Sequence, residues 1–109
     1  MDLNEYQYKA MRTAAGLDSD QLLLNAALGL CGESGEVADQ LKKHIFQGHE
    51  LQKDKIIKEF GDVLWYVAAG AEALGISMED IAKGNISKLE KRYPNGFDSK
   101  RSINRGDES

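Results

Sequence analysis

Two pairs of acidic residues have the type and spacing needed to hold a metal ion. Glu33 and Glu36 lie three positions apart in the stretch GLCGESGE, and Glu59 and Asp62 repeat this spacing in EFGD. Helical residues three positions apart are neighbours on one face, so each pair would place two carboxylates together. Carboxylates that face one another repel, and they resist loss of water unless protons or cations neutralise them. We therefore expect all four acids to bind Mg²⁺, which prefers oxygen ligands, with Mn²⁺ as a substitute.

The chain around these acids has the period of α-helices. Apolar residues recur every three to four positions over about 3–14, 20–46, 52–74 and 78–93, and no strand-like alternation persists. Gly48 and Gly75 follow the second and third segments as natural helix ends, and Pro94 stops the fourth. The sequence predicts an all-α fold, a four-helix bundle in residues 1–97, followed by a polar, flexible tail over 98–109.

Both acid pairs lie on the same side of the apolar stripe of their helices. A short loop favours antiparallel packing of neighbouring helices, which would bring the two pairs face to face. One pair alone is more often a solvated surface charge, whereas two matched pairs favour a metal site. The core of a chain of 109 residues is thin, so we expect a homodimer or a homotetramer. The small-residue run AAGAEALG in the third helix would permit a close contact between helices.

Basic and amide side chains border the core-facing side of the fourth helix. Asn85, Lys88 and Arg92 fall within one narrow arc of that helix. Arginine grips phosphate with two parallel donors, and lysine supplies a mobile point charge. The alternative is an ordinary basic last turn that complements the helix dipole.

Three further side chains share the acid face of the middle helices. Lys55 lies one turn before Glu59, Tyr66 lies one turn after Asp62, and Asn25 precedes the first acid pair by two turns. A lysine beside acids is usually an ion pair within its helix, but here it could also reach a phosphate. Four acids together with lysines and an arginine describe a site for a metal-bound polyphosphate.

Composition excludes several classes of partner. A net charge of −4 without a dominant basic face argues against binding a nucleic acid polymer. No apolar run has membrane length, so we expect no membrane partner. The single Cys31 suits a reducing cytoplasm, and its place in the apolar arc predicts a core residue. His44 and His49 do not share the acid face, so we interpret them as surface residues.

Three stretches, in this order, resemble the MazG-like all-α nucleoside triphosphate pyrophosphohydrolases. They are GLCGESGEVADQLKK, KEFGDVLWYVA and NISKLEKRYPNGF, and the resemblance covers roughly residues 20–97. It is closest to the compact single-domain branch of that family. The resemblance implies Mg²⁺-dependent hydrolysis of a deoxy or non-canonical nucleoside triphosphate to a monophosphate and pyrophosphate. Such an activity would serve the upkeep of the nucleotide pool.

The resemblance also implies roles for particular positions. Lys55, Lys88 and Arg92 match positions that contact phosphate, and Asn25, Tyr66 and Asn85 match positions near the nucleoside. Gly32 stands where some members carry an additional acid, so any role of that acid is absent or supplied elsewhere.

The catalytic candidates are Glu36 and Lys55. Glu36 could orient the attacking water or take its proton, and Lys55 could hold a phosphate oxygen beside it. Two alternatives remain open from the residues alone. One is a catalytically weak module that binds and senses nucleotides, and the other is a helical interaction protein whose acids are solvated.

Overall fold

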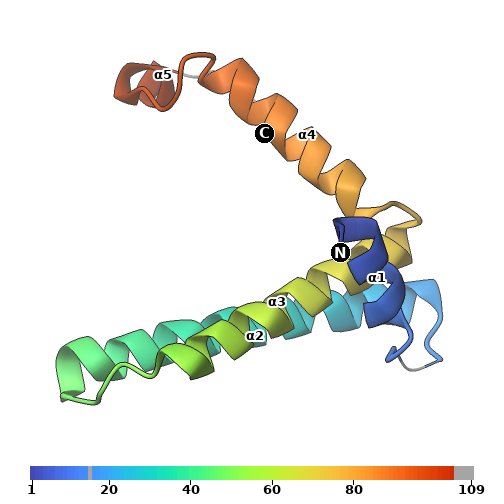
Figure 1. Cartoon of the computed structure of the whole chain (residues 1–109), viewed down its shortest axis with the longest axis horizontal. Coiled ribbons are helices and arrows are strands. Elements are labelled where there is room, and N and C mark those ends of the chain that lie inside the picture. Colours follow the sequence, from blue (N-terminus) through green and yellow to red (C-terminus); the bar gives the residue numbers. More distant parts are fainter. Residues whose placement is uncertain (15, 105–109) are drawn as a thin grey trace. The chain divides into compact units, whose positions relative to one another are not determined.

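The computed structural model describes residues 1–14 and 16–104 of the chain (Figure 1). Its helices include all four that the sequence predicted. They are α1 (Leu3–Met11), α2 (Ser19–Gln47), α3 (Lys53–Leu74), α4 (Met78–Arg92) and α5 (Ser99–Asn104). The described residues contain no strand, so the all-α prediction is confirmed. The short helix α5 was not predicted; the sequence analysis expected a polar, flexible tail over 98–109.

Local side-chain hydrogen bonds explain where several helices begin and end. Asp18 starts α2 with a reciprocal capping arrangement, in which its carboxylate accepts from the backbone N–H of Gln21, 2.8 Å away. Gly48 and Gly75 end α2 and α3 in the left-handed conformation, with φ of 73° and 70°. Helix α1 stops earlier than expected, because the Thr13 hydroxyl donates to the Ala10 carbonyl at 2.6 Å and offers the backbone an alternative.

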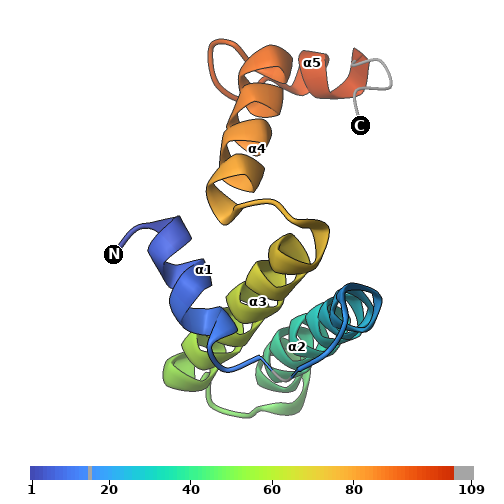
Figure 2. The same cartoon turned by 90° about the vertical axis from the view of Figure 1, so that its right-hand side faces the viewer.

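The chain forms two compact units, Met1–Met78 and Glu79–Ser109. In the first unit, α2 and α3 lie side by side as an antiparallel pair, and α1 packs against α3 (Figures 1 and 2). The loop between α2 and α3 is short, as the sequence predicted for antiparallel neighbours. This pair is the scaffold of the candidate site.

The core of the first unit is small and rich in alanine. One buried cluster joins Ala10 of α1 to Ala68 and Ala71 of α3 and to Met78, and Tyr6 and Trp65 pack against it. A second cluster joins α2 to α3 through Leu22, Ala26 and Ala69. Small side chains allow the helices to approach closely, but they remove little apolar surface from water.

Two polar side chains connect α1 to α3. The buried Gln7 amide donates to the Glu72 carboxylate and to the Ile76 carbonyl, at 3.2 and 3.1 Å, and accepts from the Met78 N–H at 2.7 Å. The Trp65 indole N–H lies 2.9 Å from the Thr13 hydroxyl and 3.2 Å from the Ala10 carbonyl. These bonds fix α1 near the C-terminal half of α3.

Large apolar side chains remain exposed along the rest of the α2–α3 pair. We call this set the apolar stripe, and it consists of Leu24, Leu28, Leu41, Ile45, Ile57, Phe60 and Leu64. Its members recur at helical spacing on both helices. Cys31 belongs to the same arc and is also exposed, so its prediction as a core residue is wrong for the single chain.

The second unit is held together by contacts between the end of α4 and the segment that follows. The Arg101 guanidinium donates to the carbonyls of Arg92 and Lys91, which are among the last carbonyls of α4. The Asp98 carboxylate accepts from the backbone N–H of Lys100 at 2.8 Å, which supports the first turn of α5.

Candidate metal centre

Carboxylates from α2 and α3 converge on one point of the first unit. Glu33 of α2 and Glu59 and Asp62 of α3 each place an oxygen atom within 4.8 Å of the others. The antiparallel packing makes this possible. The middle of α2, which carries Glu33, then lies opposite the N-terminal half of α3, which carries Glu59 and Asp62. We call these three residues the acid group. They are three of the four predicted metal ligands.

Glu36, the fourth predicted ligand, lies beside the acid group rather than within it. It is exposed, and it is one of the negative charges that raise the pKa of Glu33. It also lines a hollow that continues from the acid group towards the α2–α3 loop. Its role as a metal ligand stays a prediction.

The acid group is electrostatically strained. Its surroundings favour the protonated form of Glu33, whose pKa rises from an ordinary 4.5 to about 7. The largest cause is a hydrogen bond with Glu59, followed by burial and then by the charges of Glu59, Asp62 and Glu36. The pKa of Tyr6, on α1, is also raised, by burial and by the charge of Asp62. A proton shared between two carboxylates is what such a site adopts without other counter-charge.

The fit of a divalent cation to these residues can be judged from one buried carboxylate oxygen. Among the described residues, Glu59 Oε2 is buried and has no hydrogen-bond partner. An unpartnered buried carboxylate oxygen is costly, and coordination by a hard cation would satisfy it. Two further carboxylates lie within reach of the same point. The donor set therefore fits Mg²⁺ or a similar ion.

An aromatic hollow of about 320 Å³ adjoins one side of the acid group. It is lined by Glu33, Asp62, Trp65 and Tyr66. The two rings meet edge to face, with centroids 5.2 Å apart and an interplanar angle of 85°. An apolar ring beside carboxylates suits the flat face of a nucleobase.

Gly29 of α2 determines how close the Tyr66 ring can come. A Cβ atom added at Gly29 would lie 2.2 Å from Cε1 of Tyr66, so no other residue fits there without displacing the ring. Sequence reasoning selected Tyr66 but missed Gly29. Its position inside a helix, one turn before Glu33, was the available signal, but Gly32 and Gly35 of the same helix gave the same signal without such a contact.

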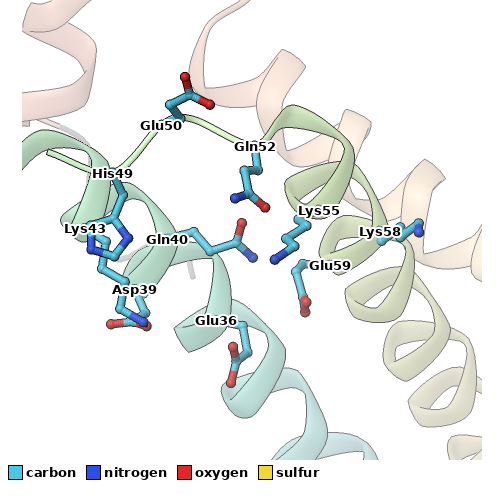
Figure 3. Close-up of a pocket in the computed structure, with 10 residues that line it drawn as sticks. All are labelled: Glu36, Asp39, Gln40, Lys43, His49, Glu50, Gln52, Lys55, Lys58 and Glu59. Carbon is cyan, nitrogen blue, oxygen red and sulfur yellow. The ribbon is translucent and has the colours of Figure 1, made fainter.

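A second, polar hollow of about 560 Å³ adjoins the other side of the acid group (Figure 3). It lies between the C-terminal half of α2 and the first two turns of α3, and both Glu36 and Glu59 line it. The predicted Lys55 also lines it, as Figure 3 shows. The predicted lysine and two of the predicted acids thus share one hollow.

The sequence model of the MazG nucleotide pyrophosphohydrolase domain matches residues 21–97. The chain belongs to this family. The match includes α3, α4 and almost all of α2, and therefore both acid pairs and the basic arc of α4.

Two individual proteins have sequences similar to this chain. The Gene 37 protein of Mycobacterium phage L5 is 34% identical over 105 residues, which cover 88% of this chain and 92% of that protein. The Uncharacterized protein YvdC of Bacillus subtilis (strain 168) is 43% identical over 42 residues, covering 38% of this chain and 40% of that protein. No solved structure gives a significant match.

The remaining predicted residues are not part of the acid group. Asn25 is exposed on α2, one turn before Gly29. Asn85, Lys88 and Arg92 belong to the second unit, so their approach to the acids stays a prediction.

In the described part of the chain, none of the helices combines the length and apolar content needed to cross a bilayer.

Proposed function

We propose that this chain hydrolyses a deoxy or non-canonical nucleoside triphosphate to the monophosphate and pyrophosphate, and that it requires Mg²⁺. The observation that carries the proposal is the convergence of Glu33, Glu59 and Asp62 around a buried oxygen that has no hydrogen-bond partner. Membership of the MazG nucleotide pyrophosphohydrolase family supports the class of reaction. Such an enzyme would act on the nucleotide pool of the cytoplasm.

The acid group and Glu36 would hold the metal. Bound Mg²⁺ would supply counter-charge to the phosphates and make a water molecule more acidic. Glu36, which is exposed and lines the polar hollow with Glu59, would orient the attacking water or accept its proton. Water would attack the α- or the β-phosphorus and break the α–β phosphoanhydride bond. The water-derived oxygen would then end on the monophosphate or on the pyrophosphate, respectively.

The other predicted residues would hold the two ends of the substrate. Lys55 lines the polar hollow next to Glu59 and would bind a phosphate oxygen. Tyr66, in the aromatic hollow, would contact the nucleoside. We also assign Asn25 and Asn85 to contacts with the nucleoside. Lys88 and Arg92 would add charge-assisted hydrogen bonds from α4, each worth about 1.5–3 kcal/mol.

Product analysis tests this proposal directly. The protein is incubated with a panel of standard, deoxy and damaged triphosphates, with Mg²⁺ or with chelator, and the products are separated by chromatography. We expect a monophosphate and pyrophosphate in Mg²⁺ alone. A diphosphate and free phosphate as primary products would contradict the proposal, and tight binding without turnover would favour the nucleotide-sensing alternative.

A matched pair of variants links the activity to the acid group. Glu59→Gln removes one charge from the acid group, and Glu90→Gln removes one exposed charge from α4. We expect Mg²⁺ to raise the melting temperature of the native protein and of Glu90→Gln, but not that of Glu59→Gln. An equal Mg²⁺-induced rise in melting temperature in all three proteins would contradict the assignment of Glu59 as a metal ligand.

We also propose that the chain assembles as a homodimer or homotetramer through the apolar stripe. The stripe leaves Ile57 65% and Phe60 59% exposed, and no large side chain among the described residues is fully buried. A second copy would cover apolar surface that one chain leaves in water.

Light scattering of two charge-introducing variants tests this assembly. Phe60→Asp lies in the stripe, whereas Tyr8→Asp changes an aromatic residue on α1 that is also exposed, 72% against 59% for Phe60. We expect Phe60→Asp to lower the oligomeric mass at micromolar concentration and Tyr8→Asp to leave it unchanged. A native protein that is monomeric at this concentration would refute the proposed assembly.

A further inference from the structure

Gln7 of α1 is the one buried residue with a polar side chain in the described part of the chain, with 8% of its surface exposed. Its amide nitrogen donates to the Glu72 carboxylate at 3.2 Å and to the Ile76 carbonyl at 3.1 Å. Its amide oxygen accepts from the Met78 N–H at 2.7 Å. A buried amide is costly unless its donors and its acceptor are paired. These three partners therefore account for a glutamine at this position.

Two of the three partners belong to the connection between α3 and α4. Gly75 ends α3 in the left-handed conformation, and the Ile76 N–H donates back to the last turn of α3 at 3.0 Å. The Ile76 carbonyl then accepts from Gln7, and Met78, which donates to Gln7, is the first residue of α4. The side chain of Gln7 thus holds the short connection 75–77 on both sides of its last residue.

The first residue of α4 is held through both its backbone and its side chain. The first N–H groups of a helix have no acceptor within that helix. For Met78 the acceptor is Gln7, which lies 71 positions earlier in the chain. The Met78 side chain is 4% exposed and belongs to the buried cluster of Ala10, Ala68 and Ala71. The start of α4 is therefore part of the core of the first unit.

The anchoring of Met78 matters because most of α4 lies outside the first unit. Glu79–Ser109 form a compact unit of their own, whereas Met78 belongs to the first unit. Lys88 lies ten residues after Met78 on the same helix, which is about 15 Å along the helix axis. A change of about 20° in the direction of the helix at Met78 would move Lys88 by about 5 Å. Such a displacement is larger than a hydrogen bond to a phosphate oxygen allows.

We infer that Gln7 is a positioning residue for the reaction, because it fixes the start of α4 and so sets the direction in which that helix presents Asn85, Lys88 and Arg92. The inference rests on the proposed function, in which these three side chains bind the substrate. It applies whether α4 serves the acid group of its own chain or that of a second copy. Gln7 itself does not have to touch the substrate, since it acts through α4.

A double-mutant cycle tests whether Gln7 acts through α4. Gln7→Met keeps a side chain of similar length and removes all three hydrogen bonds. In the native protein, we expect Lys88→Ala to lower kcat/KM for the triphosphate about tenfold or more, as for loss of a charge-assisted hydrogen bond. In Gln7→Met, the same substitution should lower it less than about threefold, because α4 no longer has a fixed direction. A purely structural role of Gln7 would lower only the folded fraction, and the effect of Lys88→Ala would then be equal in both proteins.

Two controls show whether the coupling is specific to α4. Lys55 belongs to α3, so its contribution does not pass through α4, and Lys55→Ala should lower kcat/KM by the same factor with and without Gln7→Met. Glu72→Ala removes one partner of Gln7 but leaves its bonds to the α3–α4 connection. In the Glu72→Ala protein, Lys88→Ala should therefore keep its full effect.

Distances between spin labels measure the anchoring without any substrate. Cys31→Ser removes the single native thiol, and Asp20→Cys and Glu90→Cys place exposed labelling sites on α2 and α4. The labelled protein is diluted with an excess of unlabelled protein, so that distances between copies do not contribute. We expect Gln7→Met to broaden the distance distribution about twofold or more, because it releases a local anchor, and Glu72→Ala to leave its width unchanged.

A milder variant covers the case in which Gln7→Met does not fold. Gln7→Met leaves buried backbone groups without partners, which is a severe change. Gln7→Asn keeps the amide, but its side chain is one methylene shorter and cannot reach all three partners. In Gln7→Asn we expect the same coupling to Lys88→Ala and the same broadening, both smaller than in Gln7→Met.

The outcomes separate this inference from the proposed function. Native protein that cleaves triphosphates, with an equal effect of Lys88→Ala in the presence and absence of Gln7→Met, would overturn the inference alone. Native protein that cleaves no triphosphate would overturn the proposed function, and a broadened distance distribution in Gln7→Met would then retain Gln7 as the anchor of α4. Distributions of equal width in the native protein and in Gln7→Met would overturn the anchoring in either case.

Discussion

The two ends of the α2–α3 pair differ in what covers them. At the end packed by α1, Ala68, Ala69 and Ala71 are almost completely buried. At the end near the α2–α3 loop, Ile45 and Phe46 keep 66% and 80% of their surface exposed. The acid group lies between these ends. The buried contacts that stabilise the single chain are therefore concentrated at the covered end, whereas the uncovered end leaves its large apolar side chains in water.

A larger side chain should lower the free energy of unfolding much more at the covered end than at an exposed position of α2. Ala69→Leu inserts a large side chain where 0% of the alanine is exposed, so it should lower the free energy of unfolding by about 1–3 kcal/mol. Ala38→Leu, at an exposed position of α2, should change it by less than about 0.5 kcal/mol. Urea unfolding measures both, and equal losses would show that the two ends are packed alike.

The Gly29–Tyr66 contact marks the boundary between the covered end and the acid group. Gly29→Ala must push the Tyr66 ring away, at an overpacking cost of about 1–3 kcal/mol. Replacing a mid-helix glycine by alanine returns about 1 kcal/mol, so the net loss of stability should be smaller.

The functional effect of Gly29→Ala should exceed its effect on stability. The displaced ring would disturb the aromatic hollow, so we expect a higher KM for the triphosphate, measured by steady-state kinetics. Gly32→Ala is a suitable control, because an added Cβ there meets nothing within 4 Å. An unchanged KM in both variants would remove Tyr66 from the substrate site.

Trp65→Phe should remove hydrogen bonds at the covered end, and it also replaces one of the two rings that line the aromatic hollow. The indole N–H donates to Thr13 and Ala10, and the smaller ring of phenylalanine cannot replace these bonds. We expect a loss of about 0.5–1.5 kcal/mol in thermal or urea unfolding. A loss of metal-induced stabilisation in this variant would mean that the covered end and the acid group are not independent.

The acid group should give the metal-free protein a particular dependence on pH. The pKa of Glu33 is raised in the folded chain from 4.5 to about 7, so the folded state binds this proton more tightly than the unfolded state. That stabilisation is complete below pH 4.5 and is lost as the pH rises through about 7. In chelator, the melting temperature should therefore fall between pH 5 and pH 8.

Glu33→Gln keeps a neutral side chain at every pH and should flatten this dependence. Glu90→Gln, on α4, should retain it. Melting curves in chelator across this pH interval provide the measurement. Identical slopes in the two variants would show that another group causes the dependence.

The sequence predicted the features that are set by residues close together along the chain, which are the helices and the faces on which their acids lie. Helical period located α2 and α3, and the spacing of Glu33, Glu59 and Asp62 placed these acids on facing sides. It did not reveal the Gly29–Tyr66 contact or the polar hollow, because both depend on the register of one helix against another. Helix α5 was missed because its six residues are too few for a periodic signal.

The Gln7 side chain has a consequence for how the first unit opens. One amide joins α1, the end of α3 and the backbone N–H of Met78, so fraying of α1 breaks its bonds to the other two at once. Segments joined in this way exchange their amide hydrogens as one cooperative unit. Deuterium uptake at Met78 should therefore report the fraying of a helix that lies about seventy residues earlier in the chain.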